Sequence, residues 1–192
     1  VRVSLTLVGG IGAVGYLVIK YQERQADGRE EHRIITQTHH RAFTEAIDMM
    51  GNTSLATRIA GVHALASAGT QDRELQSTII DILCGYLRIA RIQDRVVESC
   101  ILDTIAGVLA KDGQTSWRQD LVIDLHGASL SENFHLTNCT IRGMNLADMI
   151  CAGSFILKNV IVAGGFQSSH AVFTNILEVQ GCTFQVGAAC SY

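Results

Sequence analysis

Residues 123–132 read Ile-Asp-Leu-His-Gly and then Ala-Ser-Leu-Ser-Glu, and they begin a period of five that continues to residue 186. The period includes one extra residue at Asn133, two at 169–170 and one at Ile176. It fits neither the 3.6-residue period of an α-helix nor the two-residue alternation of a half-buried strand. The third position of all twelve units is apolar, and its occupants are Leu125, Leu130, Leu136, Ile141, Leu146, Cys151, Ile156, Ile161, Phe166, Phe173, Val179 and Phe184.

This spacing predicts a solenoid over residues 120–192. In a solenoid each central side chain stacks on its counterpart one coil away, and main-chain pairing between coils satisfies the polar groups. We therefore predict that the twelve third-position residues form the core of the repeats. Large first-position residues such as Phe134 indicate a less regular interior, with bulges at Asn133, 169–170 and Ile176.

The units resemble the pentapeptide-repeat family, whose consensus is A(N/D)Lxx. Met144-Asn145-Leu146-Ala147-Asp148 is among the nearest matches. The resemblance implies that each unit forms one side of a square, that four units form a coil, and that the coils stack as a right-handed β-helix. Twelve units then give about three coils.

Upstream of the repeats, apolar residues recur at helical spacing between Ile34 and Leu109. Residues 21–51 are predicted to form a juxtamembrane helix, which Gly51 ends. Residues 52–113 are predicted to form helical hairpins stacked as a short HEAT-like or armadillo-like layer. The complete prediction is an α+β chain with a helical middle and a C-terminal β-helix.

The N-terminal segment, residues 1–20, is predicted to be a transmembrane helix. Val3–Ile19 is a run of 17 residues without a charge, and no signal-peptide cleavage pattern follows it. Lys20, Arg24, Arg29 and Arg33 outnumber the single basic residue before the span, so the C-terminal region is expected in the cytoplasm and the span in the plasma membrane. The bilayer and another membrane protein or a second copy are the expected partners.

Glycines in this segment allow two interpretations. Gly10, Gly12 and Gly15 match the GxGxxG fingerprint of nucleotide-binding enzymes, but no second strand follows to complete a βαβ unit. In a membrane helix, Gly9, Gly12 and Ala13 instead form a notch of small residues that lets another helix approach. We favour the interpretation that these small residues pack against another helix over the interpretation that they bind a nucleotide.

Charge and motif content argue against several functions. The chain carries a net charge of −3, and residues 121–192 contain four acidic residues against two basic ones. This charge is too small for the DNA mimicry by which some soluble pentapeptide-repeat proteins protect topoisomerases, and nucleic acid is not an expected partner. The six cysteines lack a CxxC pair, and the histidines lack a metal-binding spacing such as HExxH. No catalytic, cofactor-binding, metal-binding or small-molecule substrate site is predicted.

The helical stretch from Ser54 and the run Ile80–Arg88 extend the resemblance to bacterial, especially actinobacterial, membrane-anchored pentapeptide-repeat proteins. That group has no established activity or catalytic residues. Rigid repeat surfaces without a convergent polar site usually bind other macromolecules. We therefore expect a non-enzymatic, membrane-anchored scaffold or accessory subunit that binds protein partners through its transmembrane helix, helical layer and repeat faces, with the DNA mimic as the alternative.

The glycine notch gives the first testable prediction. Gly9→Leu combined with Gly12→Leu should release the protein from its membrane complex, because leucine side chains fill the space that a partner helix needs. Native gel electrophoresis after mild detergent extraction measures the complex, and membrane fractionation checks that insertion is unchanged. Co-migration of the double variant with the same partners would contradict the prediction.

Overall fold

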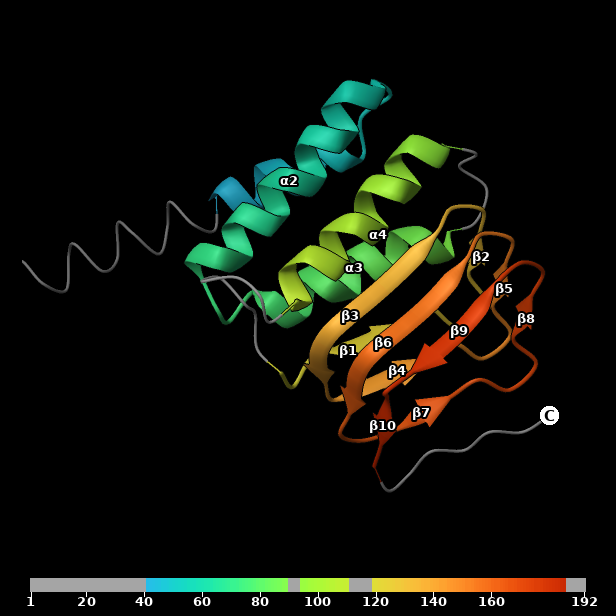
Figure 1. Cartoon of the computed structure of the whole chain (residues 1–192). Helices are drawn as coiled ribbons and strands as arrows, with labels where there is room; N and C mark the ends of the chain where they lie inside the picture. Colours follow the sequence, from blue (N-terminus) through green and yellow to red (C-terminus); the bar gives the residue numbers. More distant parts are fainter. Residues whose placement is uncertain (1–40, 90–93, 111–118, 186–192) are drawn as a thin grey trace, which may run out of the picture. The chain divides into compact units, whose positions relative to one another are not determined.

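The computed structural model describes residues 41–89, 94–110 and 119–185, and the described residues from Ala42 onward belong to one compact unit. Helices come first and strands second (Figure 1). Residues 41–50 are helical. The other helices are α2 (Leu55–Gln71), α3 (Gln76–Arg88) and α4 (Arg95–Leu109). The strands are β1 (Val122–Asp124), β2 (Ser129–Leu130), β3 (Phe134–Ile141), β4 (Gly143–Asn145), β5 (Ile150–Cys151), β6 (Phe155–Val162), β7 (Phe166–Gln167), β8 (Val172–Phe173), β9 (Leu177–Gln180) and β10 (Thr183–Phe184).

The strands form a β-solenoid, as the five-residue period predicts. It is right-handed and has about three coils, as the resemblance implies. All pairing between coils is parallel. β1, β4 and β7 form one side, and β2, β5 and β8 form a second. β3 pairs with β6, which pairs in turn with both β9 and β10. β3 and β6 each cover two sides of the coil, because each turns a corner in its middle.

Two corners of the coil place one residue per layer in the left-handed conformation, which favours glycine, asparagine and aspartate. The residues of one corner are Gly127, Asp148 and His170, with φ of 65°, 56° and 55°. Those of the other are Asn138, Asn159 and Gly181, with φ of 50°, 54° and 63°. At this second corner, the Asn159 side-chain amide donates a 3.0 Å hydrogen bond to Oδ1 of Asn138. The corners therefore stack as ladders.

The coils are longer than the 20 residues that four five-residue units would supply. Ile123 pairs with Met144, 21 residues later, and Cys151 pairs with Phe173, 22 residues later. One extra residue recurs in every coil at a third corner, which comprises residues 131–133, 152–154 and 174–176. The third coil has a further extra residue at 163–165, ahead of β7. At the third corner a Cβ on Gly153 would lie 2.1 Å from the Glu132 carbonyl oxygen, so only glycine fits.

This spacing corrects the predicted register in the second coil. The predicted insertions at Asn133 and Ile176 lie where the structure has them, but the two-residue slip at 169–170 is wrong. In the structure the two extra residues are inserted at separate places, one within 152–154 and one within 163–165. Between these points the true register is displaced by one residue. Ile156 and Ile161 are therefore only half-buried, and their neighbours Leu157 and Val162 lie in the interior.

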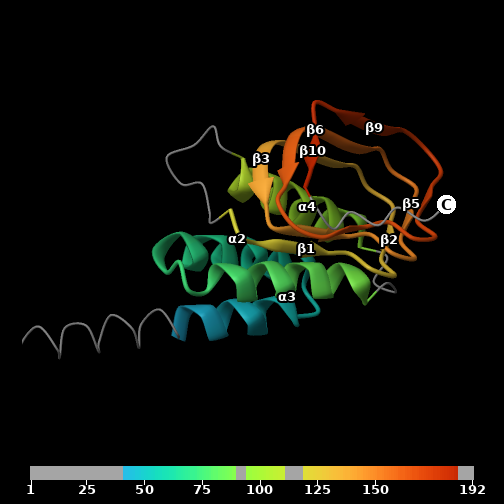
Figure 2. The ribbon, with the colours of Figure 1, turned by 90° about the horizontal axis from the view of Figure 1, so that it is seen from below.

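The helices cover the first coil of the solenoid. α3 packs against β1 and β2, and α4 packs against β3 (Figure 2). Apolar side chains of both helices, including Ile79, Leu83 and Ile101, are fully buried in one core that continues into the repeats. The inward-facing residues of the first coil are consequently shielded from water, although this coil ends the solenoid.

Polar bonds fix this helical layer in place. Glu98, in the first turn of α4, accepts hydrogen bonds from the main-chain N–H groups of Ser131 and Glu132 at 2.6 and 2.7 Å, and from the Ser131 hydroxyl at 2.8 Å. Arg88, at the end of α3, forms a 2.6 Å ion pair with Asp124 of β1. α3 is thus bonded to the end of β1, and α4 is bonded to the corner of the first coil at residues 131–133.

The helices are also linked to one another. Arg58 of α2 donates a hydrogen bond to the Tyr86 hydroxyl of α3 at 3.3 Å and forms an ion pair with Asp94, just before α4. A Cβ on Gly61 would lie 2.9 Å from the Ala46 carbonyl oxygen, so α2 approaches the helix of residues 41–50 closely. The helical layer predicted for the middle of the chain is therefore a cap on the repeats.

The predicted transmembrane segment of residues 1–20, with its Gly10–Gly15 motif, lies outside the described residues. Among the helices that the structure does describe, none has the length and hydropathy needed to cross a bilayer.

The corrected register is tested by two neighbouring substitutions. Leu157→Asp should lower the free energy of unfolding by about 3 kcal/mol or more, because it buries an unpaired charge. Ile156→Asp should cost about 1 kcal/mol, because this side chain is half-exposed on the outer face. Urea denaturation of both variants measures the difference. If Ile156→Asp instead lowered the free energy of unfolding more than Leu157→Asp, the register predicted from the five-residue period would be the correct one.

Candidate functional site

The most distinctive recess among the described residues is an apolar hollow of about 520 Å³ in the third coil. Its lining is contributed by the inward-facing residues of the second and third coils. These residues are Leu146, Phe155, Leu157, Phe166, Ser168, His170, Ala171, Phe173, Leu177, Val179 and Phe184.

The hollow exists because the two ends of the solenoid differ. Interior side chains of the first two coils, such as Phe134 and Phe155, are fully buried. Their counterpart in the third coil, Leu177, is 50% exposed, and so is the inward-facing Val179. Helices cover the first coil, but no described element covers the third.

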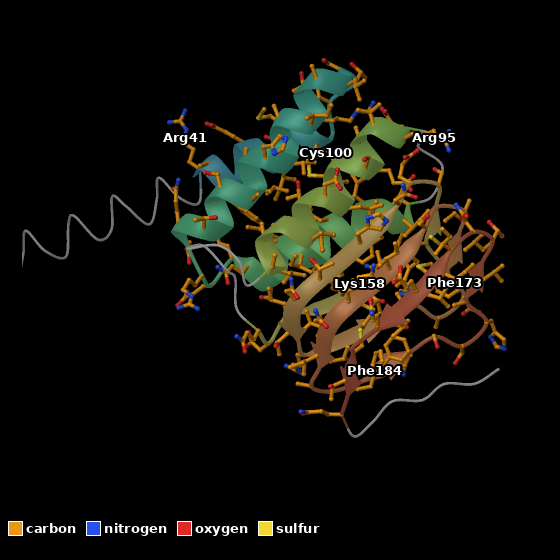
Figure 3. The ribbon with its side chains drawn as sticks, in the orientation of Figure 1. Arg41, Arg95, Cys100, Lys158, Phe173 and Phe184 are labelled. Atoms are coloured by element: carbon orange, nitrogen blue, oxygen red, sulfur yellow. The ribbon has the colours of Figure 1, made fainter. Side chains whose placement is uncertain are left out.

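Four phenylalanine rings, those of Phe155, Phe166, Phe173 and Phe184, line the hollow, and Phe155 also contacts the buried ring of Phe134. The rings of Phe134 and Phe155 lie 5.4 Å apart, and those of Phe155 and Phe173 lie 5.3 Å apart. Phe166 and Phe184 form a separate pair at 4.6 Å. All three pairs are tilted rather than stacked face to face, and their centroid separations fall in the range of favourable aromatic contacts. Phe173 and Phe184 mark the open coil in Figure 3.

Two polar side chains, those of Ser168 and His170, are part of the lining. Ser168 follows the strand pair Asn145–Gln167 and so takes the place that Leu146 has one coil earlier, and Nδ1 of His170 lies 3.3 Å from Oδ1 of Asp148. Among residues 163–185 the sequence has one Asp, Glu, Lys or Arg, Glu178, which forms a 3.0 Å ion pair with Lys158 of the second coil. The hollow therefore carries no charge that would attract an ionic ligand.

A more polar cluster lies at the other end of the solenoid, where Asp124 contacts Arg88 and His126. Burial opposes ionisation of Asp124, but hydrogen bonds from His126 and the charge of Arg88 outweigh it and lower the pKa of this carboxyl group. The shortest distance between the two side chains is 3.0 Å, from Oδ1 of Asp124 to Nδ1 of His126. The carboxylate is thus stabilised as the acceptor that joins α3 to the first coil, which is a structural role.

The described residues offer no site of metal or buried-thiol chemistry. They contain no group of three or more His, Cys, Asp or Glu side chains arranged to hold a metal ion. Burial raises the pKa of Cys84 to about 12 and also raises the pKa of Cys151. Both thiols are therefore protonated at neutral pH and act as small apolar side chains.

The structure separates the predicted core residues into three groups. Leu125, Leu130, Leu136, Ile141, Leu146 and Cys151 are buried in the first two coils. Phe166, Phe173, Val179 and Phe184 are half-buried or exposed in the third coil, where they line the hollow. Ile156 and Ile161 lie on the outer face of β6. The predicted packing residues Gly9, Gly12 and Ala13 are outside the described residues.

The predicted register missed Phe155 and Leu157 as interior residues. A signal for them was present in the sequence. Insertions at Asn133 and Ile176 are 43 residues apart, about two coils, which indicates an insertion at the same corner of the coil between them. That insertion brings Phe155 and Leu157 into the interior.

No protein-family model, curated protein or solved structure matches the chain.

Proposed function

We propose that this chain is a non-enzymatic interaction module whose uncovered third coil binds an apolar, extended segment of a protein partner. The observation that supports this proposal is the hollow itself. Phenylalanine and aliphatic side chains of the third coil face solvent there, at positions whose counterparts in the preceding coils are buried. A contiguous exposed apolar surface of this kind is typical of interaction sites.

The main chain of the third coil favours a polypeptide as the partner. Among the described strands, β7 and β8 each pair on one side only, with β4 and β5, and both β9 and β10 pair with β6. Edge strands of this kind can accept another strand through main-chain hydrogen bonds. An extended segment can pair with the edge and place apolar side chains in the hollow, whereas a small apolar ligand can satisfy only the hollow.

A second copy fits the hollow less well than a different protein. In a symmetric end-to-end dimer the same surface meets itself, so that two hollows of about 520 Å³ face each other. Protein interiors rarely retain voids of that size. A partner with protruding apolar side chains fills the space, and the near-neutral third coil favours an uncharged segment over nucleic acid.

We further propose that the chain belongs to the membrane-anchored pentapeptide-repeat proteins and that Val3–Ile19 anchors it in the plasma membrane, with the solenoid in the cytoplasm. The charge-free run and the basic residues that follow it support the anchor. The described solenoid and the unit at residues 144–148 support the family. Anchoring would hold the open coil near membrane-associated partners.

Two matched valines of the third coil test the docking site. Val179 is 50% exposed and lines the hollow, and Val172 is 49% exposed and does not line it. Peptides can be selected from a random display library against the full chain in detergent micelles, and their affinities measured by calorimetry. Val179→Asp should weaken binding at least about tenfold, the effect of a charge in an apolar contact, and Val172→Asp should change it little.

Other outcomes would contradict the docking site. Equal loss of binding in the two variants, or loss only with Val172→Asp, would move the site to the outer face of the repeats. Failure to select any peptide would argue against the recognition of extended segments.

A further inference from the structure

A second recess, between α2 and α4, contains a thiol beside an imidazole. Sγ of Cys100 on α4 lies 3.7 Å from Nε2 of His63 on α2, within hydrogen-bonding distance for sulfur. Cys100 is half-buried, and His63 is exposed. Figure 3 shows Cys100 among the helices, away from the solenoid hollow.

The recess can accommodate a small molecule. Its volume is about 600 Å³, in the range of small-ligand sites. Ile59, Val96 and Val108 supply apolar walls, and Ser99, Asp103 and Thr104 supply polar groups. We call this recess the α2/α4 groove.

Gly107 keeps part of the α2/α4 groove open. A Cβ at this position would meet no atom within 4 Å, so packing does not require a glycine. Glycine in a helix interior is about 1 kcal/mol less favourable than alanine. Gly107 therefore lowers the stability of α4 without a steric reason, and its lack of a side chain leaves space in the α2/α4 groove that Cys100 also lines.

Burial raises the pKa of the Cys100 thiol, although a hydrogen bond with Thr104 opposes the shift. Cys100 therefore needs a neighbouring base to become a nucleophile, because the thiolate is the reactive form. His63 is placed to accept its proton. Among the described residues, the other half-buried thiol is that of Cys182, which lies 3.4 Å from the Leu157 carbonyl oxygen, and this oxygen cannot serve as that base.

We propose that Cys100 and His63 form a modification site for small, uncharged or cationic disulfides with an apolar body. The carboxylate of Asp103 in the α2/α4 groove disfavours anionic ones. The Cys100 proton passes to Nε2 of His63, and Sγ bonds to one sulfur of the disulfide. The disulfide bond breaks, and the leaving thiolate takes the proton from His63. Cys100 ends as a mixed disulfide, and the other half of the reagent is reduced to a thiol.

The test uses the full chain and 2,2′-dithiodipyridine, a neutral aromatic disulfide whose released thione is followed by absorbance. Peptide mass spectrometry assigns the modified cysteine. Cys100 should react before Cys182. His63→Gln should slow Cys100 at least about tenfold, the size of a modest general-base effect. Gly107→Leu should also slow it, because the added side chain occupies the α2/α4 groove.

His135→Gln is the matched control, because His135 is an exposed histidine of β3. It should leave the rate unchanged, and thermal unfolding of each variant checks that the fold is intact. An unchanged Cys100 rate in either His63→Gln or Gly107→Leu would overturn the proposal. Equal rates at Cys100 and Cys182 would also overturn it.

Discussion

Covering the ends of the solenoid is the constraint on which the rest of this structure depends. Each coil buries its inward-facing side chains only against the coils on both sides, so the first and last coils need another cover. At the first coil this cover is α3 and α4, held by the carboxylate of Glu98 and by the Arg88–Asp124 ion pair. At the third coil the described chain supplies none, and the hollow results. The helical layer thus covers one end of the described solenoid, and the other end stays open because the described chain has no second layer.

The extent to which the sequence predicts the fold follows from how the coils stack. Apolar residues at every fifth position reveal the solenoid, because Leu125, Leu146 and the other central residues must face inward. The corners are harder to predict, since an inserted residue changes the register without changing composition. Gly153 marks such a corner. The reason for the glycine is that a Cβ there would lie 2.1 Å from the carbonyl oxygen of Glu132, and this contact joins residues 21 positions apart in the sequence. For the same reason the sequence showed neither the hollow nor the meeting of His63 with Cys100.

The proposed docking site and the proposed thiol site lie on separate parts of the molecule. The hollow is built from the second and third coils, whereas the α2/α4 groove is built from the helical cap. The two sites share no lining residue, so substitutions at one should leave the other intact. The arrangement is that of a capped solenoid with an apolar recognition end and a distant cysteine open to modification.

Hydrogen exchange of the isolated chain tests most directly whether the third coil is uncovered. β3 and β9 both pair with β6, but only β3 is covered by a helix on its other side. We expect protection of β3 amides close to that of β6, and exchange of β9 amides at least about a hundredfold faster, because an uncovered edge strand opens locally. Equal protection of β3 and β9 would show that the third coil is covered, and it would contradict the docking site proposed there.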